Sequence, residues 1–499
     1  MPGFAPDPQW AARKSGSLSS ASRLRRTLSC PAGPGSAFSA LRQSAQNVSN
    51  EWLMARSSLS VAVRNGTQSS AALPGAKAGG NRCPPAGRIA PAPHSSHHRN
   101  MGRKPKVAIV GGGIGGLAAA LALHRRGLEA AVFEQSAAPG DIGAGLNLGP
   151  NALKAFRALG VEDAAVAVGV QTGQQIIRNW RSGRVILRQQ RGDAIARRFD
   201  AGFLTIHRAD MVEVFLRALP ESLLSFGAAC TGVEQRGAVA AARFADGSAV
   251  EADIVVGADG IHSAVRESLF GADAPRFTGC VCWRGLVPVE AVAGSDFGRD
   301  MTAWWGPHGH VVHYLVRGGA LVNFVAHYDS EAWTGESWTQ ECERSELTET
   351  YARWNASLLR LFESSERYYK WALYDRDPLD EWGRGGITLL GDAAHPMLPY
   401  LAQGAGMAVE DGCVLGEAVA RLGDDPAAAL RAYERARMPR TRRAQLGARE
   451  RARENHLASP FARFRRDLRL MLRDRLGRKT APLYGAWLYD YDVAAVENL

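Results

Sequence analysis

The chain is 499 residues long, which is enough for two domains with a sizeable core, and it carries a formal net charge of +11. Residues 1–100 contain twelve Arg or Lys but only two acids, Asp7 and Glu51, so they contribute +10 of this charge and leave the rest of the chain nearly neutral. This distribution excludes a polycationic body, and we expect no nucleic-acid partner.

Residues 1–100 are rich in Ser, Ala, Pro, Gly and Arg and have no sustained hydrophobic period, so we predict a disordered basic extension. Its acid-poor composition resembles an organellar transit peptide. We favour the alternative that translation starts at Met101, because MGRKPKVAIVGGG would then place the first strand directly after a short basic leader. The sequence leaves open whether residues 1–100 are expressed.

The seven cysteines include no C-x-x-C pair, which is typical of a reduced cytoplasm rather than of a disulfide scaffold. Cys280 and Cys282 lie on an apolar strand without further ligands nearby in the sequence, so we predict that they pack in the core and hold no metal. The apolar run over 107–123 includes five glycines and is slightly shorter than the roughly 18 apolar residues that indicate a membrane span. We therefore expect no membrane span and a cytoplasmic protein. The sequence leaves open whether it forms a homodimer.

A dinucleotide-binding pattern begins at residue 107. An apolar strand over 107–110 runs into Gly111, Gly113 and Gly116, spaced G-x-G-x-x-G, and an Ala/Leu-rich helix follows. In such a turn the first glycine permits the tight bend, the second lets the backbone approach a pyrophosphate, and the third lets the helix pack on the strand. A second strand ends at Glu134, 18 residues after Gly116, where a carboxylate would bind ribose hydroxyls. The sequence therefore predicts a Rossmann-like nucleotide site.

The next segments alternate between helical and strand patterns. Arg208 precedes a predicted helix, and it either pairs with a cofactor phosphate or caps a surface turn. Asp259 follows a buried strand and stands at its carboxyl end, where α/β sheets bind ligands. The predicted elements are a helix over 151–159, antiparallel strands between 170 and 205, a helix over 211–219, a hairpin over 239–250 and a strand over 254–256.

Residues 276–374 are again rich in strands, with a helix predicted over 347–362. A strand is predicted over 310–316, and period-two geometry places His310 and Tyr314 on the same face, about 13 Å apart. An imidazole and a phenol on one face can act on a phenolic substrate. A histidine on a strand is, however, more often structural.

The chain then returns to the nucleotide domain. An apolar strand over 387–390 ends in Gly391 and Asp392, and Gly404 and Gly406 precede a helix that we predict to end near residue 422. A strand end, a carboxylate and a glycine-led helix N-terminus would meet there beside a ribityl chain or a pyrophosphate. Residues 427–476 are helical and rich in Arg, and we predict that charges such as those at 435–443 face solvent.

Three motifs stand in a fixed order: G-x-G-x-x-G with Glu134, then Gly-Ala-Asp259-Gly260, then Gly391-Asp392-Ala-Ala-His395-Pro396. The set resembles the single-component FAD-dependent aromatic hydroxylases, especially salicylate hydroxylases and 3-hydroxybenzoate 6-hydroxylases, over nearly all of residues 104–492. The resemblance implies an α/β fold, a Rossmann-like FAD-binding domain with an inserted mixed-sheet substrate domain and C-terminal helices. The implied boundaries are 101–175, 206–275 and 379–425 for the FAD-binding domain, 176–205 and 276–378 for the substrate domain, and 426–499 for the helices.

The resemblance also implies roles in holding FAD. Glu134 would bind the adenosine ribose, and Arg208 would bind the FAD. Asp259 would lie near the nicotinamide and the pyrophosphate, and Asp392 would hold the ribityl and phosphate region.

For the substrate, His310 and Tyr314 match a family strand whose His and Tyr, four apart, flank the phenol. Pro399 stands where 3-hydroxybenzoate 6-hydroxylases commonly have Gln. The segment HPMLPY therefore looks more like that of salicylate or 6-hydroxynicotinate hydroxylases.

By this resemblance NADH or NADPH reduces the FAD, and O2 then forms a flavin hydroperoxide that hydroxylates a small aromatic substrate. The ring must be activated as a phenolate by a base with a pKa of about 7, for which neutral His310 is the candidate. Salicylate would lose CO2 and give catechol. The alternatives are 3-hydroxybenzoate or 6-hydroxynicotinate hydroxylation, an oxidase, dehydrogenase or epoxidase of the same fold, and a flavin-binding regulatory module without turnover.

Overall fold

The structure, a computed structural model, describes residues 104–140, 144–295, 297–331, 341–476 and 485–496. The basic extension predicted for residues 1–100 lies outside the described residues. All of the described residues belong to one unit, His97–Leu499.

A six-stranded, mostly parallel sheet carries the glycine motifs. In order across the sheet its strands are β18 (Gly383–Arg384), β19 (Ile387–Leu389), β12 (Ile254–Gly257), β1 (Lys106–Val110), β2 (Glu129–Glu134) and β8 (Leu224–Phe226). All neighbours pair in parallel except β18 with β19. The central strands are runs of buried Val, Ile and Ala, as expected for a parallel sheet covered by helices. The carboxyl ends of β1, β12 and β19 therefore share one edge of the sheet.

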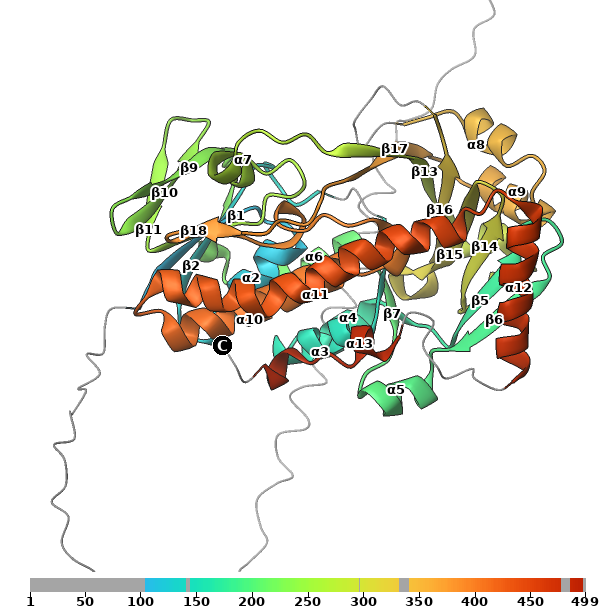
Figure 1. Cartoon of the computed structure of the whole chain (residues 1–499), viewed down its shortest axis with the longest axis horizontal. Coiled ribbons are helices and arrows are strands. Elements are labelled where there is room, and N and C mark those ends of the chain that lie inside the picture. Colours follow the sequence, from blue (N-terminus) through green and yellow to red (C-terminus); the bar gives the residue numbers. More distant parts are fainter. Residues whose placement is uncertain (1–103, 141–143, 296, 332–340, 477–484, 497–499) are drawn as a thin grey trace, which may run out of the picture. The chain divides into compact units, whose positions relative to one another are not determined.

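Helix α10 lies against α2 (Figure 1). A Cβ added at Gly412 would come within 2.6 Å of the Ala119 nitrogen, and one added at Gly416 would come within 2.7 Å of the Ala122 Cβ. Small residues at this crossing let the two helices approach closely. The helices of this domain are α2 (Ile114–Arg125), α3 (Pro150–Ala158), α4 (Glu162–Val168), α6 (Arg208–Ala218), α7 (Ala264–Phe270) and α10 (Gly404–Leu422).

Two small antiparallel sheets accompany this domain. The first has the order β3 (Gly145–Leu148), β7 (Leu204–His207) and β4 (Val170–Gln171), and the second has the order β11 (Ala249–Ala252), β10 (Val239–Phe244) and β9 (Cys230–Arg236). Antiparallel pairing of β10 with β11 confirms the predicted hairpin.

The second large sheet is the mixed sheet of the inserted domain. Its order is β17 (Tyr369–Asp375), β13 (Arg276–Pro288), β16 (Leu321–Asp329), β15 (Gly309–Val316), β14 (Met301–Gly306), β5 (Gln174–Asn179) and β6 (Val185–Gln190). All pairs are antiparallel except β14 with β5. The predicted fold class is confirmed. Along the chain, strands of the first large sheet alternate with strands of the second. The residue boundaries of the domains stay a prediction.

Two predicted elements are wrong in detail. Antiparallel strands were predicted between 170 and 205, and β5 and β6 confirm two of them, but α5 (Asp193–Phe199) follows β6, with Ile195 and Phe199 buried four residues apart on one side. The helix expected over 347–362 is two helices, α8 (Arg344–Thr350) and α9 (Ala356–Glu363). The break occurs because the Asn355 side chain caps α9 by accepting a hydrogen bond from the Ser357 nitrogen, while the Asn355 nitrogen donates to the Trp180 carbonyl.

The C-terminal helices are α11 (Pro426–Asn455), α12 (Pro460–Arg475) and α13 (Ala486–Tyr489). Asp425 caps α11 and Ser459 caps α12, each followed by proline in the first helical turn. Helix α11 packs on α10, and the residue that follows α11, His456, reaches Asp329 at the end of β16. In Figure 1, α11 extends along the molecule from the first sheet to the second. Short 3-10 helices lie at Glu221–Leu223, Val289–Val292, Arg317–Gly319, Gly391–Ala393 (η4), Pro399–Leu401 (η5) and Val493–Ala495.

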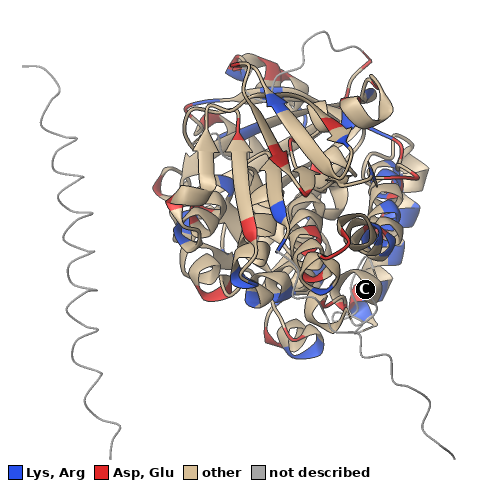
Figure 2. Cartoon of the chain, turned by 90° about the vertical axis from the view of Figure 1, so that its left-hand side faces the viewer, with Lys and Arg blue, Asp and Glu red and all other residues tan. Residues whose placement is uncertain are grey.

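Charged residues of both signs are interspersed over the sheet and the helices of the face in Figure 2. Within the described ranges, no helix combines the length and the apolar character that crossing a membrane requires.

Candidate active site

The turn after β1 requires glycine at two positions. Gly111 has φ +108°, and a Cβ there would lie 2.3 Å from the Ala258 carbonyl oxygen at the end of β12. A Cβ at Gly116 would lie 2.0 Å from the carbonyl oxygen of Gly111 itself. Gly113 differs, because no atom lies within 4 Å of the position where its Cβ would stand. The turn is therefore packed tightly at its two ends and open at Gly113, the N-cap of α2.

Glu134 lies beside this turn at the end of β2. Its Oε2 accepts a hydrogen bond from the Gly112 nitrogen at 2.7 Å, and its Oε1 accepts one from the Ser136 nitrogen at 2.9 Å. The carboxylate is half-buried and held in one orientation next to the start of α2.

Helices α2 and α10 both begin at this edge of the sheet without a side-chain cap and without an acidic residue in the first turn. Their first N–H groups and the positive ends of their dipoles are therefore available to an anion. At the start of α10, Gly404 is open, with only Met397 at 3.8 Å from a Cβ built there. Gly406 instead packs on α3, since its Cβ would lie 3.2 Å from the Ala152 Cβ.

Asp392 follows β19 and is exposed to solvent. Burial nevertheless raises its pKa, against the opposing effects of His395 and Arg208. Burial lowers the pKa of Arg284 on β13 to about 10, and the charge of Arg208, the exposed first residue of α6, contributes to this lowering. Arg208 is thus close to both the Asp392 loop and the second sheet.

Asp259 stands next to the glycine turn, but its own hydrogen bonds go to α7. Its carboxylate accepts from the Ser263 hydroxyl at 2.5 Å and from the Val265 nitrogen at 3.2 Å. Burial raises its pKa, and these hydrogen bonds oppose that change.

A buried ionic cluster holds the loop that carries Asp392. Asp411 on α10 contacts His395 Nε2 at 2.5 Å, accepts from the Gly391 nitrogen at 3.2 Å and pairs with Arg437 Nε on α11 at 2.6 Å. Arg437 also pairs with the neighbouring Glu410 at 2.8 Å. Burial alone would raise the pKa values of both carboxyl groups, but the adjacent cations, Arg437 among them, lower both.

This cluster was not found from the sequence, which predicted that the charges of 435–443 face solvent. That prediction is wrong for Arg437, which is fully buried, and for Arg440, which is partly buried against Glu410. The available signal was the Glu-Asp pair at 410–411 within an apolar stretch of α10, because buried carboxylates require cationic partners.

His310 is buried on β15 and lies within a cluster of rings. Its Nδ1 is 2.8 Å from His456 Nε2, and its ring stacks on His327 at a centroid distance of 4.2 Å. Tyr400, eight residues after Asp392, lies 5.4 Å from the His310 ring. Burial lowers the pKa of His310 well below its usual value, and His327 and His456 lower it further, so the imidazole is neutral. A neutral ring agrees with the prediction, but the pKa lies below the value of about 7 expected of the base.

Tyr314 is on the same face of β15, near the other end. Its hydroxyl donates to the Gly145 carbonyl at 2.7 Å, and burial raises its pKa. Gly145 begins β3, and its nitrogen donates to Asn323 Oδ1 at 2.9 Å. Tyr314 therefore attaches the second sheet to the segment that follows the first two strands of the nucleotide domain.

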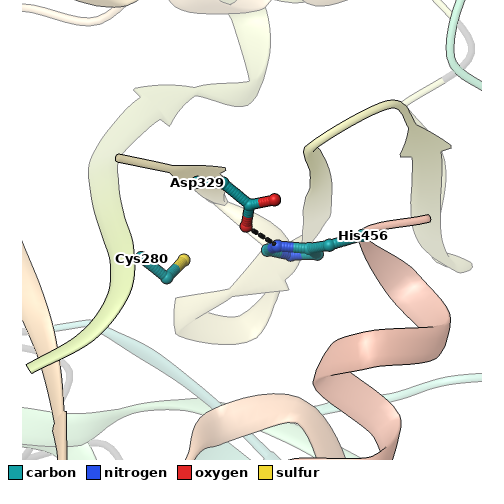
Figure 3. Close-up of side chains that lie close together, drawn as sticks. All are labelled: Cys280, Asp329 and His456. Carbon is teal, nitrogen blue, oxygen red and sulfur yellow. Dashed lines mark hydrogen bonds and ion pairs between the residues drawn. The ribbon is translucent and has the colours of Figure 1, made fainter. Parts of the chain in front are cut away.

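Cys280, Asp329 and His456 come together at the edge of this ring cluster (Figure 3), and one atom from each lies within 4.8 Å of the others. The sequence did not reveal these neighbours of Cys280. His456 Nδ1 is 2.5 Å from Asp329 Oδ1. Two ligands of one tetrahedral zinc ion would be about 3.4 Å apart, so the His456–Asp329 separation is that of a hydrogen bond.

Comparison with known proteins agrees with this geometry. Residues 104–446 match the family model described as an FAD binding domain. The chain is 39% identical over 403 residues to 3-amino-4-hydroxybenzoate 2-monooxygenase PtnB3 of Streptomyces platensis, which covers 81% of this chain and 99% of the relative. It is 38% identical over 348 residues to the 6-hydroxynicotinate 3-monooxygenase of Bordetella bronchiseptica, covering 69% of this chain and 91% of the relative.

The chain belongs to the FAD-dependent aromatic monooxygenases. A solved salicylate hydroxylase substrate complex has a TM-score of 0.66 at 27% identity and covers 78% of this chain and 96% of that one. The predicted family, cofactor and enzyme class are confirmed, which favours this monooxygenase over a regulatory module without turnover.

The residues of this monooxygenase fit an FAD. The open position at Gly113 leaves room for a pyrophosphate at the N-terminus of α2, and Glu134 offers a fixed acceptor next to it. The second uncapped helix, α10, starts after the loop that carries Asp392.

Proposed function

We propose that this monooxygenase hydroxylates a small aromatic acid that carries a ring hydroxyl, with NADH or NADPH and O2 as co-substrates. The supporting observation is His310, a neutral imidazole on the face of β15 that adjoins Tyr400 in the loop after Asp392. The names of the relatives point to hydroxybenzoates and hydroxynicotinates, and Pro399 inclines us to salicylate or 6-hydroxynicotinate.

The FAD would be held by the two uncapped helix ends and by carboxylates. In this proposal Gly111, Gly113 and Gly116 shape the turn for the pyrophosphate, and Glu134 binds the adenosine ribose. Asp392 and Gly404 would hold the ribityl and phosphate region, with Gly406 fixing the start of α10, while Arg208 and Asp259 border the site. Because the sequence has no second dinucleotide motif, the nicotinamide cofactor would bind transiently.

The FAD supplies the activated oxygen, and the protein supplies orientation and proton transfer. A phenol reacts well with an electrophilic oxygen only as its phenolate. His310 would take the phenolic proton, and Tyr314, which holds Gly145, would keep β15 and β3 in register around the ring.

The test is the His310→Ala variant of the FAD-loaded enzyme. We expect NADH oxidation to persist while hydroxylated product falls by about a hundredfold, the usual contribution of a general base. Product and NADH consumption are measured together across a pH range spanning neutrality. Coupled hydroxylation that matches the wild type at every pH would remove His310 from the reaction.

The substrate is identified by titrating the oxidised enzyme with salicylate, 6-hydroxynicotinate, 3-hydroxybenzoate and 3-amino-4-hydroxybenzoate. The true substrate perturbs the flavin absorption band, accelerates reduction by NADH and is converted to a hydroxylated product. Rapid NADH oxidation that yields only hydrogen peroxide with all four would indicate an oxidase instead.

We also propose a reducing, cytoplasmic location without a nucleic-acid partner. All five cysteines of the described residues are free. A homodimer remains to be tested by the mass of the protein in solution.

A further inference from the structure

Three side chains from three distant parts of the sequence form a continuous hydrogen-bonded chain. His310 Nδ1 lies 2.8 Å from His456 Nε2. His456 Nδ1 lies 2.5 Å from Asp329 Oδ1, the contact drawn as a dashed line in Figure 3. His310 is on β15, Asp329 ends β16, and His456 directly follows α11. We call His310, His456 and Asp329 the relay.

The carboxylate fixes the position of every proton in the relay. Ionised Asp329 can only accept, so His456 must carry its proton on Nδ1. If Nδ1 carries the single proton of the His456 ring, its Nε2 can only accept from His310, and His310 then carries its own proton on Nδ1. The remaining nitrogen, His310 Nε2, is therefore unprotonated and able to receive a proton.

The surroundings separate a buried end of the relay from an exposed end. His310 is buried and faces the His327 ring and Tyr400, while Cys280 lies near His456, and the cation of Arg451 acts on His310 from α11. At the other end the Asp329 side chain is 40% exposed, and its Oδ2 lies 3.6 Å from His308 Nδ1, whose side chain is 51% exposed.

These groups determine where a proton is stable. Burial lowers the pKa of His327 to about 3, so it adds no charge near neutrality. Burial and the cation of Arg451 disfavour a proton that stays on His310, whereas Asp329 at the other end of the relay is an anion. A proton that enters at His310 is therefore driven toward Asp329 and the solvent.

We propose that His456 and Asp329 are positioning residues that fix His310 as the acceptor and conduct the substrate proton to solvent. This inference rests on the proposed function, since it needs a phenolic substrate beside His310. It explains how a histidine with a lowered pKa can serve as the base.

The transfer balances. The phenol O–H breaks and a bond forms between that proton and His310 Nε2. The Nδ1 proton of His310 passes to His456 Nε2, and the Nδ1 proton of His456 passes to Asp329, which releases it to water. No electrons move, and the phenolate is left in the site. Return of the two imidazoles to their starting tautomers completes the cycle.

The first test needs no substrate. In the FAD-loaded protein labelled at its histidine ring nitrogens, nitrogen NMR reports which nitrogen of each ring is protonated. We expect Nδ1–H for His310 and His456, with the His456 signal assigned by its absence in His456→Gln. In Asp329→Asn we expect the Nδ1–H preference to be lost. Nε2–H on His456 in the unmodified protein would overturn the relay.

The second test measures ionisation of a bound phenol. Fluorine NMR follows 3-fluoro-4-hydroxybenzoate on the oxidised, FAD-loaded protein as pH is raised. After the transfer His310 Nε2–H donates to the phenolate and stabilises it, so loss of the relay should raise the ionisation midpoint of the phenol by about one pH unit, or tenfold, in His456→Gln and Asp329→Asn. The control is His313→Gln, a buried histidine on the opposite face of β15, which should leave the midpoint unchanged.

The two proposals fail differently. A midpoint that is the same in His456→Gln as in the unmodified protein overturns the relay, while the proposed function stands. Should neither this probe nor any of the four aromatic acids bind or be hydroxylated, the proposed function fails. The nitrogen NMR result still decides whether the hydrogen-bonded chain exists.

Discussion

Gly113 and Gly116 lie three residues apart in one turn, yet a methyl group would meet very different surroundings at each. At Gly116 it would overlap the Gly111 carbonyl, which is backbone and cannot swing away. At Gly113 it would enter open space at the N-cap of α2, with φ −74°, which alanine adopts freely. Glycine is therefore required by the fold at Gly116, whereas we propose that Gly113 leaves space for the FAD.

We expect Gly116→Ala to lower the free energy of unfolding by about 3 kcal/mol, the upper end of ordinary overpacking, whether or not FAD is present. Gly113→Ala should cost the FAD-free protein about 1 kcal/mol or less, because alanine is merely a poor N-cap. It should weaken FAD binding, since the methyl group occupies the space next to the helix end. Urea unfolding and flavin titration separate the effects, and equal stability losses in the two variants would contradict this division.

The Asp392 carboxylate can be removed without disturbing hydrogen bonds of the described structure. The carboxylate is exposed and has no hydrogen bond within the described residues, so its removal should leave the fold intact. We expect Asp392→Ala to purify colourless or to lose FAD on gel filtration, with a melting temperature close to that of the FAD-free parent. A yellow, fully loaded variant would show that the FAD lies elsewhere.

At the scale of elements, α10 and α11 are joined through buried charges. Arg437 lies between Glu410 and Asp411, and Asp411 in turn holds Gly391 and His395. The position of the Asp392 loop therefore depends on a side chain in a different helix, 45 residues further along the chain than Asp392. This connection makes α11 a support of the loop that carries Asp392.

Replacing Arg437 with Met would keep the volume but leave two carboxylates buried without this partner. We expect Arg437→Met to lower the free energy of unfolding by about 3–5 kcal/mol, as for other broken buried ion pairs, and to weaken FAD retention. The exposed Arg435→Met in the same helix is the control and should change stability by less than about 0.5 kcal/mol. Chemical unfolding measures both, and a small loss for Arg437→Met would mean that the cluster relaxes.

The sequence predicts a feature well when that feature depends on residues that are close together in the chain. The turn at Gly111–Gly116, the strand of His310 and the start of α10 depend on nearby residues, and their elements were predicted correctly. The contact of His456 with Asp329 joins residues 127 apart, and no local pattern encodes it. The break at Asn355 was missed because a single capping side chain outweighed the helical spacing of its neighbours.

At the scale of the whole molecule, neither large sheet is made from one continuous stretch. The second sheet takes β5 and β6 from residues before β12 of the first, and the first takes β18 and β19 from residues after the second. Helix α11 is bound to α10 near its middle and to the end of β16 just beyond its C-terminus. Each large sheet is therefore completed only by chain segments that also pass through the other sheet.

We expect residues 101–499 to unfold in one thermal transition, because loss of either sheet removes strands or helix contacts from the other. Differential scanning calorimetry checks this through the ratio of the calorimetric to the van't Hoff enthalpy, which should be close to one. Two resolved transitions, or a stable proteolytic fragment containing one sheet, would show that the domains are independent.

The pairing of β12 with β19 has a consequence for how the protein is made. Ile387–Leu389 must emerge from the ribosome before the strand formed by Ile254–Gly257 gains its second neighbour, and Arg437 must follow before the charges of α10 are neutralised. Contacts of such long sequence separation form late and slowly. The nascent chain therefore carries an open, apolar sheet edge while the residues between Gly257 and Ile387 are synthesised, and we expect it to depend on chaperones during that interval.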